Sequence, residues 1–141
     1  MIPVKVLAVR YLANASSALA KGLGAPKGYP SLAMLTTDCD DATYIALDEA
    51  TKAADVKVCY GASFYAGAAN ASTPYAGEVI GILAGATPGA VRSGMHAALQ
   101  ALEHIGFEQV NDVPYLAHTV SRSGHYLAQV AGVREGTALA Y

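Results

Sequence analysis

Between residues 31 and 105 the apolar residues alternate between strand spacing and helix spacing, and this order limits the possible folds more than any other feature of the sequence. Residues 31–36 form a short apolar run typical of a buried strand, and residues 42–54 show helical spacing. Residues 56–60 alternate as a half-buried strand does, and residues 78–83 predict another strand. We therefore expect an α+β domain in which helices pack on one face of a small sheet.

The starts of two helices are marked by polar residues. Thr87 is expected to cap the clearer one, with Pro88 at its first position and Gly106 after its end. One face of this helix carries Val91, Met95, Ala98, Leu99, Leu102 and Ile105. The other helix follows Asp40 and Asp41, either of which can cap it. Its expected inner stripe is Ile45, Ala46, Ala50 and Ala53.

Shorter elements are expected on both sides of this region. The N-terminal part predicts a strand, a helix and a turn segment, at residues 4–9, 16–23 and 24–30. The C-terminal part predicts a connector, a strand, a short helix and the opening of a further strand, at residues 107–114, 115–121, 124–130 and 139–141. Within the core region, residues 61–77 are rich in glycine and alanine and predict a long loop.

Charge and hydropathy exclude several classes of protein. Nine basic and eleven acidic residues give a net charge of −2, and no run of Lys and Arg marks a nucleic-acid binder. An uninterrupted apolar segment of about 20 residues, as a membrane span requires, is also missing. Charged residues make up 14% of the chain, against about 25% in an average protein. We therefore expect an oligomer or a lattice component, whose surface is partly covered by other protein.

Asp38-Cys39-Asp40-Asp41, the densest acidic cluster, follows the first buried strand. Asp38 and Asp40 could serve as nucleophile and acid/base in a hydrolase of the haloacid-dehalogenase type, or the chain could be a ligand-binding regulator that uses them. Thr43, however, comes one residue later than that motif requires, and no downstream lysine or second acidic pair is evident. Helix capping is the simpler use of these carboxylates.

No other pattern indicates catalysis or a cofactor. The four histidines, His96, His104, His118 and His125, lack the spacing of metal ligands, so no metal site is expected. Walker and dinucleotide-binding loops are missing. Two cysteines, Cys39 and Cys59, are too few for a disulfide framework and fit a reducing cytosol.

Much of the chain resembles the tandem-domain bacterial microcompartment (BMC) shell proteins of ethanolamine utilisation. The similar blocks are Ser31-Leu32, Asp38-Cys39-Asp40-Asp41-Ala42-Thr43-Tyr44, Asp48-Glu49-Ala50-Thr51-Lys52, Tyr65-Ala66-Gly67-Ala68, Ala76-Gly77-Glu78-Val79 and Ala117-His118-Thr119-Val120-Ser121-Arg122-Ser123-Gly124. The resemblance implies a non-enzymatic protein with permuted BMC domains, each a small antiparallel sheet with helices on one face. Residues 1–105 would form the first domain and residues 106–141 an incomplete second one.

The resemblance also implies partners and a pore. Such proteins form homotrimers of pseudo-hexameric shape that tile, with other shell proteins, the shell of a compartment in the bacterial cytoplasm. No cofactor is implied. Carried over by position, Asp40, Asp41 and Glu78 would surround ethanolamine in a small pore, with Phe107 contributing its backbone. The loop over residues 61–77 would be either a pore gate or a static surface loop, and its gating candidates are Phe64, Tyr65, Gly67, Asn70, Tyr75 and Gly77.

Overall fold

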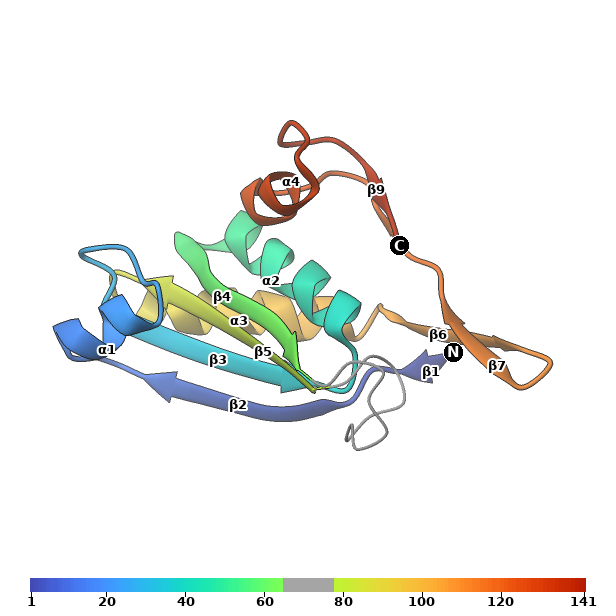
Figure 1. The fold of residues 1–141 in the computed structure, drawn as a ribbon, viewed down its shortest axis with the longest axis horizontal. Helices are drawn as coiled ribbons and strands as arrows, with labels where there is room; N and C mark the ends of the chain where they lie inside the picture. The colour runs from blue at the N-terminus through green and yellow to red at the C-terminus, as the bar shows by residue number, and fades with distance from the viewer. Residues whose placement is uncertain (65–77) are drawn as a thin grey trace.

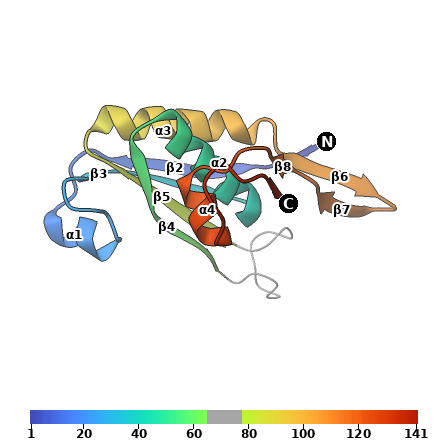
Figure 2. The same cartoon turned by 90° about the horizontal axis from the view of Figure 1, so that it is seen from above.

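Four antiparallel strands form the central sheet of the computed structural model, which describes residues 1–64 and 78–141 (Figure 1). In spatial order they are β2 (Val6–Leu12), β3 (Ser31–Thr37), β5 (Glu78–Gly85) and β4 (Val56–Phe64). Helices α2 (Asp40–Ala53) and α3 (Pro88–Leu102) lie together on one face of this sheet (Figures 1 and 2). The predicted α+β architecture is confirmed.

The main core lies between this sheet and the two helices. The apolar stripe of α3 faces it as predicted, with Val91, Met95, Ala98 and Leu102 buried and Leu99 partly buried. Ile105 is also buried, but it lies beyond the end of the helix. On α2, Ile45, Ala46 and Ala50 are buried as predicted. Ala53 is exposed, because it lines an open groove between α2 and α3 instead of the core, so its place in the inner stripe was predicted wrongly.

The two main helices begin in different ways. The predicted cap of α3 is confirmed, because Thr87 Oγ1 accepts a hydrogen bond of 3.2 Å from the Ala90 amide. The predicted cap of α2 is wrong: Cys39 is its N-cap residue, and Asp40 and Asp41 already lie in the first turn. In that turn their carboxylates still meet the positive end of the helix dipole.

Two elements differ from the predicted connector and loop. Residues 107–114 were expected to be irregular, but β6 (Gly106–Val110) and β7 (Val113–Leu116) form a hairpin. Its turn residues, Asn111 and Asp112, have φ values of 50° and 63°, the left-handed conformation that two-residue hairpin loops require. Residues 61–64, expected to belong to a loop, continue β4.

The chain ends add smaller elements. The predicted N-terminal helix is α1 (Ser17–Gly22), which packs against the other face of the sheet. Strand β1 (Ile2–Pro3) pairs with β6, so that β1, β6 and β7 form a second sheet. The expected strand over residues 115–121 is interrupted, because β7 ends at Leu116 and β8 (Thr119–Val120) pairs instead with β9 (Leu139–Ala140). The predicted short helix α4 (His125–Ala131) packs on α2.

Candidate functional site

The acidic cluster lies where β3 ends and α2 begins. Asp38 Oδ1 accepts a hydrogen bond of 2.9 Å from the Lys5 amide, and the Asp38 amide donates to the Lys5 carbonyl at 3.1 Å. These bonds fix the end of β3 to the segment between β1 and β2. The Asp38 carboxylate is therefore held by the backbone, which does not suit the nucleophile of the hydrolase alternative.

Asp40 and Asp41 share the first turn of α2, and Asp40 Oδ1 accepts a hydrogen bond of 2.7 Å from the Asp41 amide. Asp41 is exposed. The pKa of the Asp41 carboxyl is nevertheless raised, first because nearby protein displaces part of its solvent and second because the negative charge of Asp40 lies close to it. Two adjacent carboxylates that repel each other would both gain from a bound cation.

The strand register places Glu78 at the same end of the sheet. Leu35 of β3 pairs with Gly81 of β5, so the end of β3 lies beside the beginning of β5, where Glu78 is the first residue. Phe107, in β6, pairs with Ile2 and is buried. It belongs to the core cluster that also contains Cys39 and Ala42, the neighbours of the acidic turn. The backbone thus gathers Asp40, Asp41 and Glu78 at one sheet end.

Three tyrosines that the sequence analysis did not single out lie near Asp40, Asp41 or Asp48 of α2. Burial, then the charges of Asp40 and Asp41, raises the pKa of Tyr44. Burial, then Asp41 and Asp48, raises that of Tyr141. Tyr126 is the most affected: burial first, and then Tyr44, Tyr141 and Asp48, raises its pKa to about 12. All three hydroxyls therefore stay protonated at neutral pH and can donate or accept hydrogen bonds.

Glycine at position 61 makes room for this tyrosine cluster. A Cβ atom built on Gly61 would lie 2.5 Å from Tyr126 Oη and 3.7 Å from Tyr44 Cε1. The Tyr126 ring reaches this position from α4, while Gly61 belongs to β4 and Tyr44 to α2. The spacing of Tyr44 from the acids on one helix could have been noticed in the sequence. The positions of Tyr126 and Tyr141, which come from distant segments of the chain, could not have been predicted from the sequence.

Asp48 anchors α4 beside this cluster. Its side chain is fully buried, and its two oxygens accept hydrogen bonds of 2.7 Å from the Gly124 amide and 2.9 Å from the Leu127 amide. Lys52 Nζ lies 3.6 Å from Asp48 Oδ2 and 2.6 Å from Glu49 Oε1. A buried carboxylate with two backbone donors at a helix start is a strong, charge-assisted anchor.

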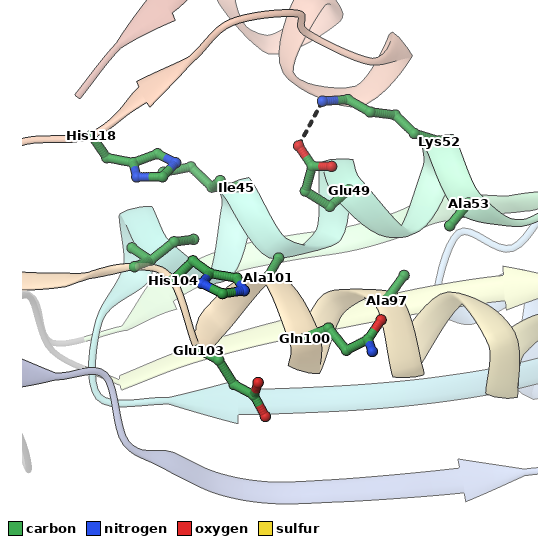
Figure 3. A pocket seen from close by; sticks show the side chains of 11 residues that line it. Ile45, Glu49, Lys52, Ala53, Ala97, Gln100, Ala101, Glu103, His104 and His118 are labelled. Carbon is green, nitrogen blue, oxygen red and sulfur yellow. Dashed lines mark hydrogen bonds and ion pairs between the residues drawn. The ribbon is translucent and has the colours of Figure 1, made fainter.

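An open groove of about 600 Å³ lies between α2 and α3 (Figure 3), and its lining includes none of Asp40, Asp41 and Phe107. His104, His118, Glu103 and the paired Glu49 and Lys52 line its rim. In residues 1–64 and 78–141, no cluster of three or more His, Cys, Asp or Glu side chains could hold a metal ion. Nor is any helix in these ranges long and apolar enough to cross a membrane.

Most of the predicted gating residues lie outside residues 1–64 and 78–141, which the structure describes. Phe64 is the last residue of β4 and is 37% exposed. The other five, Tyr65, Gly67, Asn70, Tyr75 and Gly77, lie outside the described residues. The gating role of this segment stays a prediction.

Comparison with known proteins defines the class to which this fold and site belong. The family model "BMC domain" matches residues 31–114. The protein PduB, described as a trimeric bacterial microcompartment shell protein, shares the fold with a TM-score of 0.74 at 17% identity, over 94% of this chain and 58% of its own. The class is that of BMC-domain proteins.

More similar relatives narrow the assignment. The chain is 52% identical to the bacterial microcompartment shell protein EutL of Clostridium perfringens (strain 13 / Type A), over all of this chain and 67% of that protein. A crystal structure of the ethanolamine utilization protein EutL from Leptotrichia buccalis matches with 53% identity and a TM-score of 0.89, over 99% of this chain and 66% of that one. The chain belongs to the EutL family of bacterial microcompartment shell proteins.

Family membership confirms the expected BMC fold and the expected role in a shell rather than in catalysis, since the relatives carry the names of shell proteins. The chain spans about two thirds of the length of the curated relatives that it matches, between 66% and 67%. The division into domains at residue 105 and the assignment of pore residues stay predictions.

Proposed function

We propose that this chain builds part of the shell of an ethanolamine-utilisation microcompartment in the bacterial cytoplasm, as a homotrimer that contacts other shell proteins. The names of its EutL relatives support the compartment, and the trimeric state given for PduB supports the oligomer. The low share of charged residues, 14%, supports extensive contact with other protein. Tiling of a closed surface needs no chemistry of its own, only repeated contacts between copies.

We propose further that residues 1–105 form a first BMC domain and residues 106–141 the beginning of a second. The order of elements supports this division. In the first unit, strand β2, helix α1 and strand β3 follow one another, and the two strands pair antiparallel. Strand β8, helix α4 and strand β9 repeat this order, again with antiparallel pairing.

Asp40 and Asp41 are proposed to bind the ammonium group of ethanolamine, with Glu78 and the backbone of Phe107 completing a narrow pore. The observation that carries this proposal is the meeting of the acidic turn of α2 and the beginning of β5 at one end of the sheet. An ammonium group donates up to three hydrogen bonds, and carboxylate and carbonyl oxygens accept them. Rings of acidic side chains select cations in channels for the same reason.

Calorimetric titration with ethanolamine tests this assignment. Asp40→Asn and Asp41→Asn should each weaken binding by about tenfold or more, because each removes a negative charge next to the cation. Asp112→Asn is the matched control, since Asp112 is an exposed acid in the hairpin turn and asparagine tolerates its φ of 63°. Unchanged affinity in both site variants would refute the proposed pore.

The hydrolase alternative has no support beyond the motif itself. Asp38 is held by the Lys5 backbone, and the relatives are shell proteins. No turnover of phosphate esters is expected from the purified chain.

A further inference from the structure

The hairpin of β6 and β7 projects away from the rest of the molecule. Both views show it extending past the end of the central sheet (Figures 1 and 2). Strand β1 pairs only with Gly106 and Phe107 at the base of the hairpin, residues 108–115 are all exposed, and a hairpin of two strands alone is at best marginally stable in water. A projecting arm of this kind gains stability when another surface covers it.

One face of this arm is apolar. Val110 pairs with Val113 and Glu108 with Tyr115, so the alternation of β-strands places all four side chains on the same face. Val110, Val113 and Tyr115 are 56%, 62% and 43% exposed. The face therefore offers three large apolar side chains and a single carboxylate.

A complementary surface exists on the central sheet of the same chain. Ala33 and Leu35 point into the core beneath the helices, so Met34 and Thr36 point to the opposite face. Among residues 1–64 and 78–141, helix α1 covers one part of that face, above Leu32, Ile82 and Ala84. The other part holds a depression of about 140 Å³ lined by Ala8, Arg10, Met34, Leu35, Thr36 and Ile80.

The charges of the two surfaces also match. Arg10 is the one charged residue that lines the depression. Its guanidinium donates to the Val9 carbonyl at 2.8 Å and forms no ion pair within residues 1–64 and 78–141. Glu108 on the arm likewise has no ion pair there. Pairing a carboxylate with a guanidinium at the rim of an apolar contact favours one register and one orientation.

We propose that the β6–β7 arm of one copy docks on the part of the sheet face of the next that the described residues leave uncovered, with Val110 and Val113 over Met34 and Ile80 and with Glu108 beside Arg10. This inference rests on the proposed trimer and names the contact that closes it. Because the two surfaces differ, the contact is head-to-tail, and such contacts form closed rings when the rotation between copies divides a full turn.

Cysteine cross-linking tests the contact directly. Chains carrying Val110→Cys are mixed with chains carrying Met34→Cys at pH 8 under mild oxidation. The native thiols of Cys39 and Cys59, whose pKa values burial raises to about 11, stay mostly protonated at this pH. A mixed disulfide dimer should form. Val130→Cys, at a site 68% exposed on α4, is the control and should not cross-link with Met34→Cys.

A charge exchange supplies the second test, read by sedimentation equilibrium. Glu108→Arg and Arg10→Glu should each raise the dissociation constant of self-association about tenfold, and the double variant should restore it. Efficient cross-linking of the control, or no effect of the charge variants, would overturn the proposed contact. Trimers that persist in these variants would leave the proposed shell function standing without this contact. A wild-type chain that stays monomeric would overturn both the contact and the trimer.

Discussion

The amide of Gly124, which precedes α4, donates a hydrogen bond of 2.7 Å to Oδ2 of Asp48 on α2, across 76 residues of sequence. The other oxygen of the same carboxylate accepts from the Leu127 amide at 2.9 Å. Helix α4 contains only seven residues and would not be stable alone. Its position therefore depends on this buried carboxylate and on the apolar contacts of Leu127 and Ala128.

Replacing Asp48 with alanine should lower the free energy of unfolding by about 3 kcal/mol, because two buried amides lose a charged acceptor. Urea unfolding measures this change. Hydrogen exchange at the Gly124 and Leu127 amides should accelerate more than exchange in α3. Glu49→Ala is the matched control on the same helix, and it should cost less than about 1 kcal/mol, because the Glu49 ion pair with Lys52 lies at the surface. Equal costs for the two variants would contradict the anchor.

Gly61 is expected to tolerate no larger side chain while Tyr126 keeps its hydroxyl. Gly61→Ala should destabilise the chain by about 1–3 kcal/mol, since the new Cβ would lie 2.5 Å from Tyr126 Oη. Tyr126→Phe removes that oxygen, so the double variant should lose less stability than the two single variants together. A double-mutant cycle from thermal unfolding gives the coupling between the two positions. Strict additivity would show that the hydroxyl does not limit position 61.

Local signals explain the parts of the fold that the sequence predicted well. Thr87 and Pro88 begin α3 as expected, because a cap depends only on residues within one turn. The hairpin turn at Asn111 and Asp112 was missed, since the sequence lacks the glycine that usually marks such turns. The caps proposed for α2 failed because Cys39, not an aspartate, precedes its first turn.

Long-range contacts explain what the sequence could not predict about the site. Asp48 gives no local sign of its role, because both of its amide partners come from α4. Pattern analysis could not predict either that Tyr126 comes close to Asp48 or that Tyr141 comes close to Asp41 and Asp48, because both tyrosines belong to the C-terminal part. The acids of the proposed site came from the family resemblance, while the strand register that brings Glu78 to their end of the sheet came from the structure.

From the raised pKa of the Cys39 thiol, we expect the folded chain to lose stability at alkaline pH. Burial in the core is the main reason that the pKa of its thiol rises from 9.0 to about 11, with the nearby aspartates adding to the effect. The unfolded chain therefore loses this proton at lower pH than the folded chain does. The thiol's contribution to stability is complete below pH 9 and falls as the pH rises from 9 to 11, by about 1 kcal/mol at pH 10.

The variant Cys39→Ala isolates this contribution. It should be less stable than wild type at pH 8, because the buried sulfur is lost, but its stability should fall about 1 kcal/mol less between pH 8 and pH 10. Urea unfolding at the two pH values provides the comparison, and the titration of Cys59 and Tyr126 is common to both chains. Parallel pH profiles for the two chains would contradict the assignment.

From the raised pKa of the Asp41 carboxyl, we expect a particular pH dependence of ethanolamine binding. A carboxyl binds an ammonium group only when ionised, and the pKa of Asp41 is raised from its ordinary value of 3.8 by burial and by Asp40. Affinity should therefore begin to fall at a higher pH than for an ordinary carboxyl as the solution is acidified. In Asp41→Asn the weaker residual binding should lose this part of the pH dependence. Titration calorimetry between roughly pH 7 and pH 4 distinguishes the two profiles.

A structure determined from crystals of the protein grown in the presence of ethanolamine tests the central proposal most directly. The account predicts three copies around one axis, with the ligand's ammonium group within hydrogen-bond distance of the carboxylates of Asp40 and Asp41 and of Glu78. Monomers packed without such an axis, together with an acidic turn that binds no ethanolamine at saturating concentration, would contradict it.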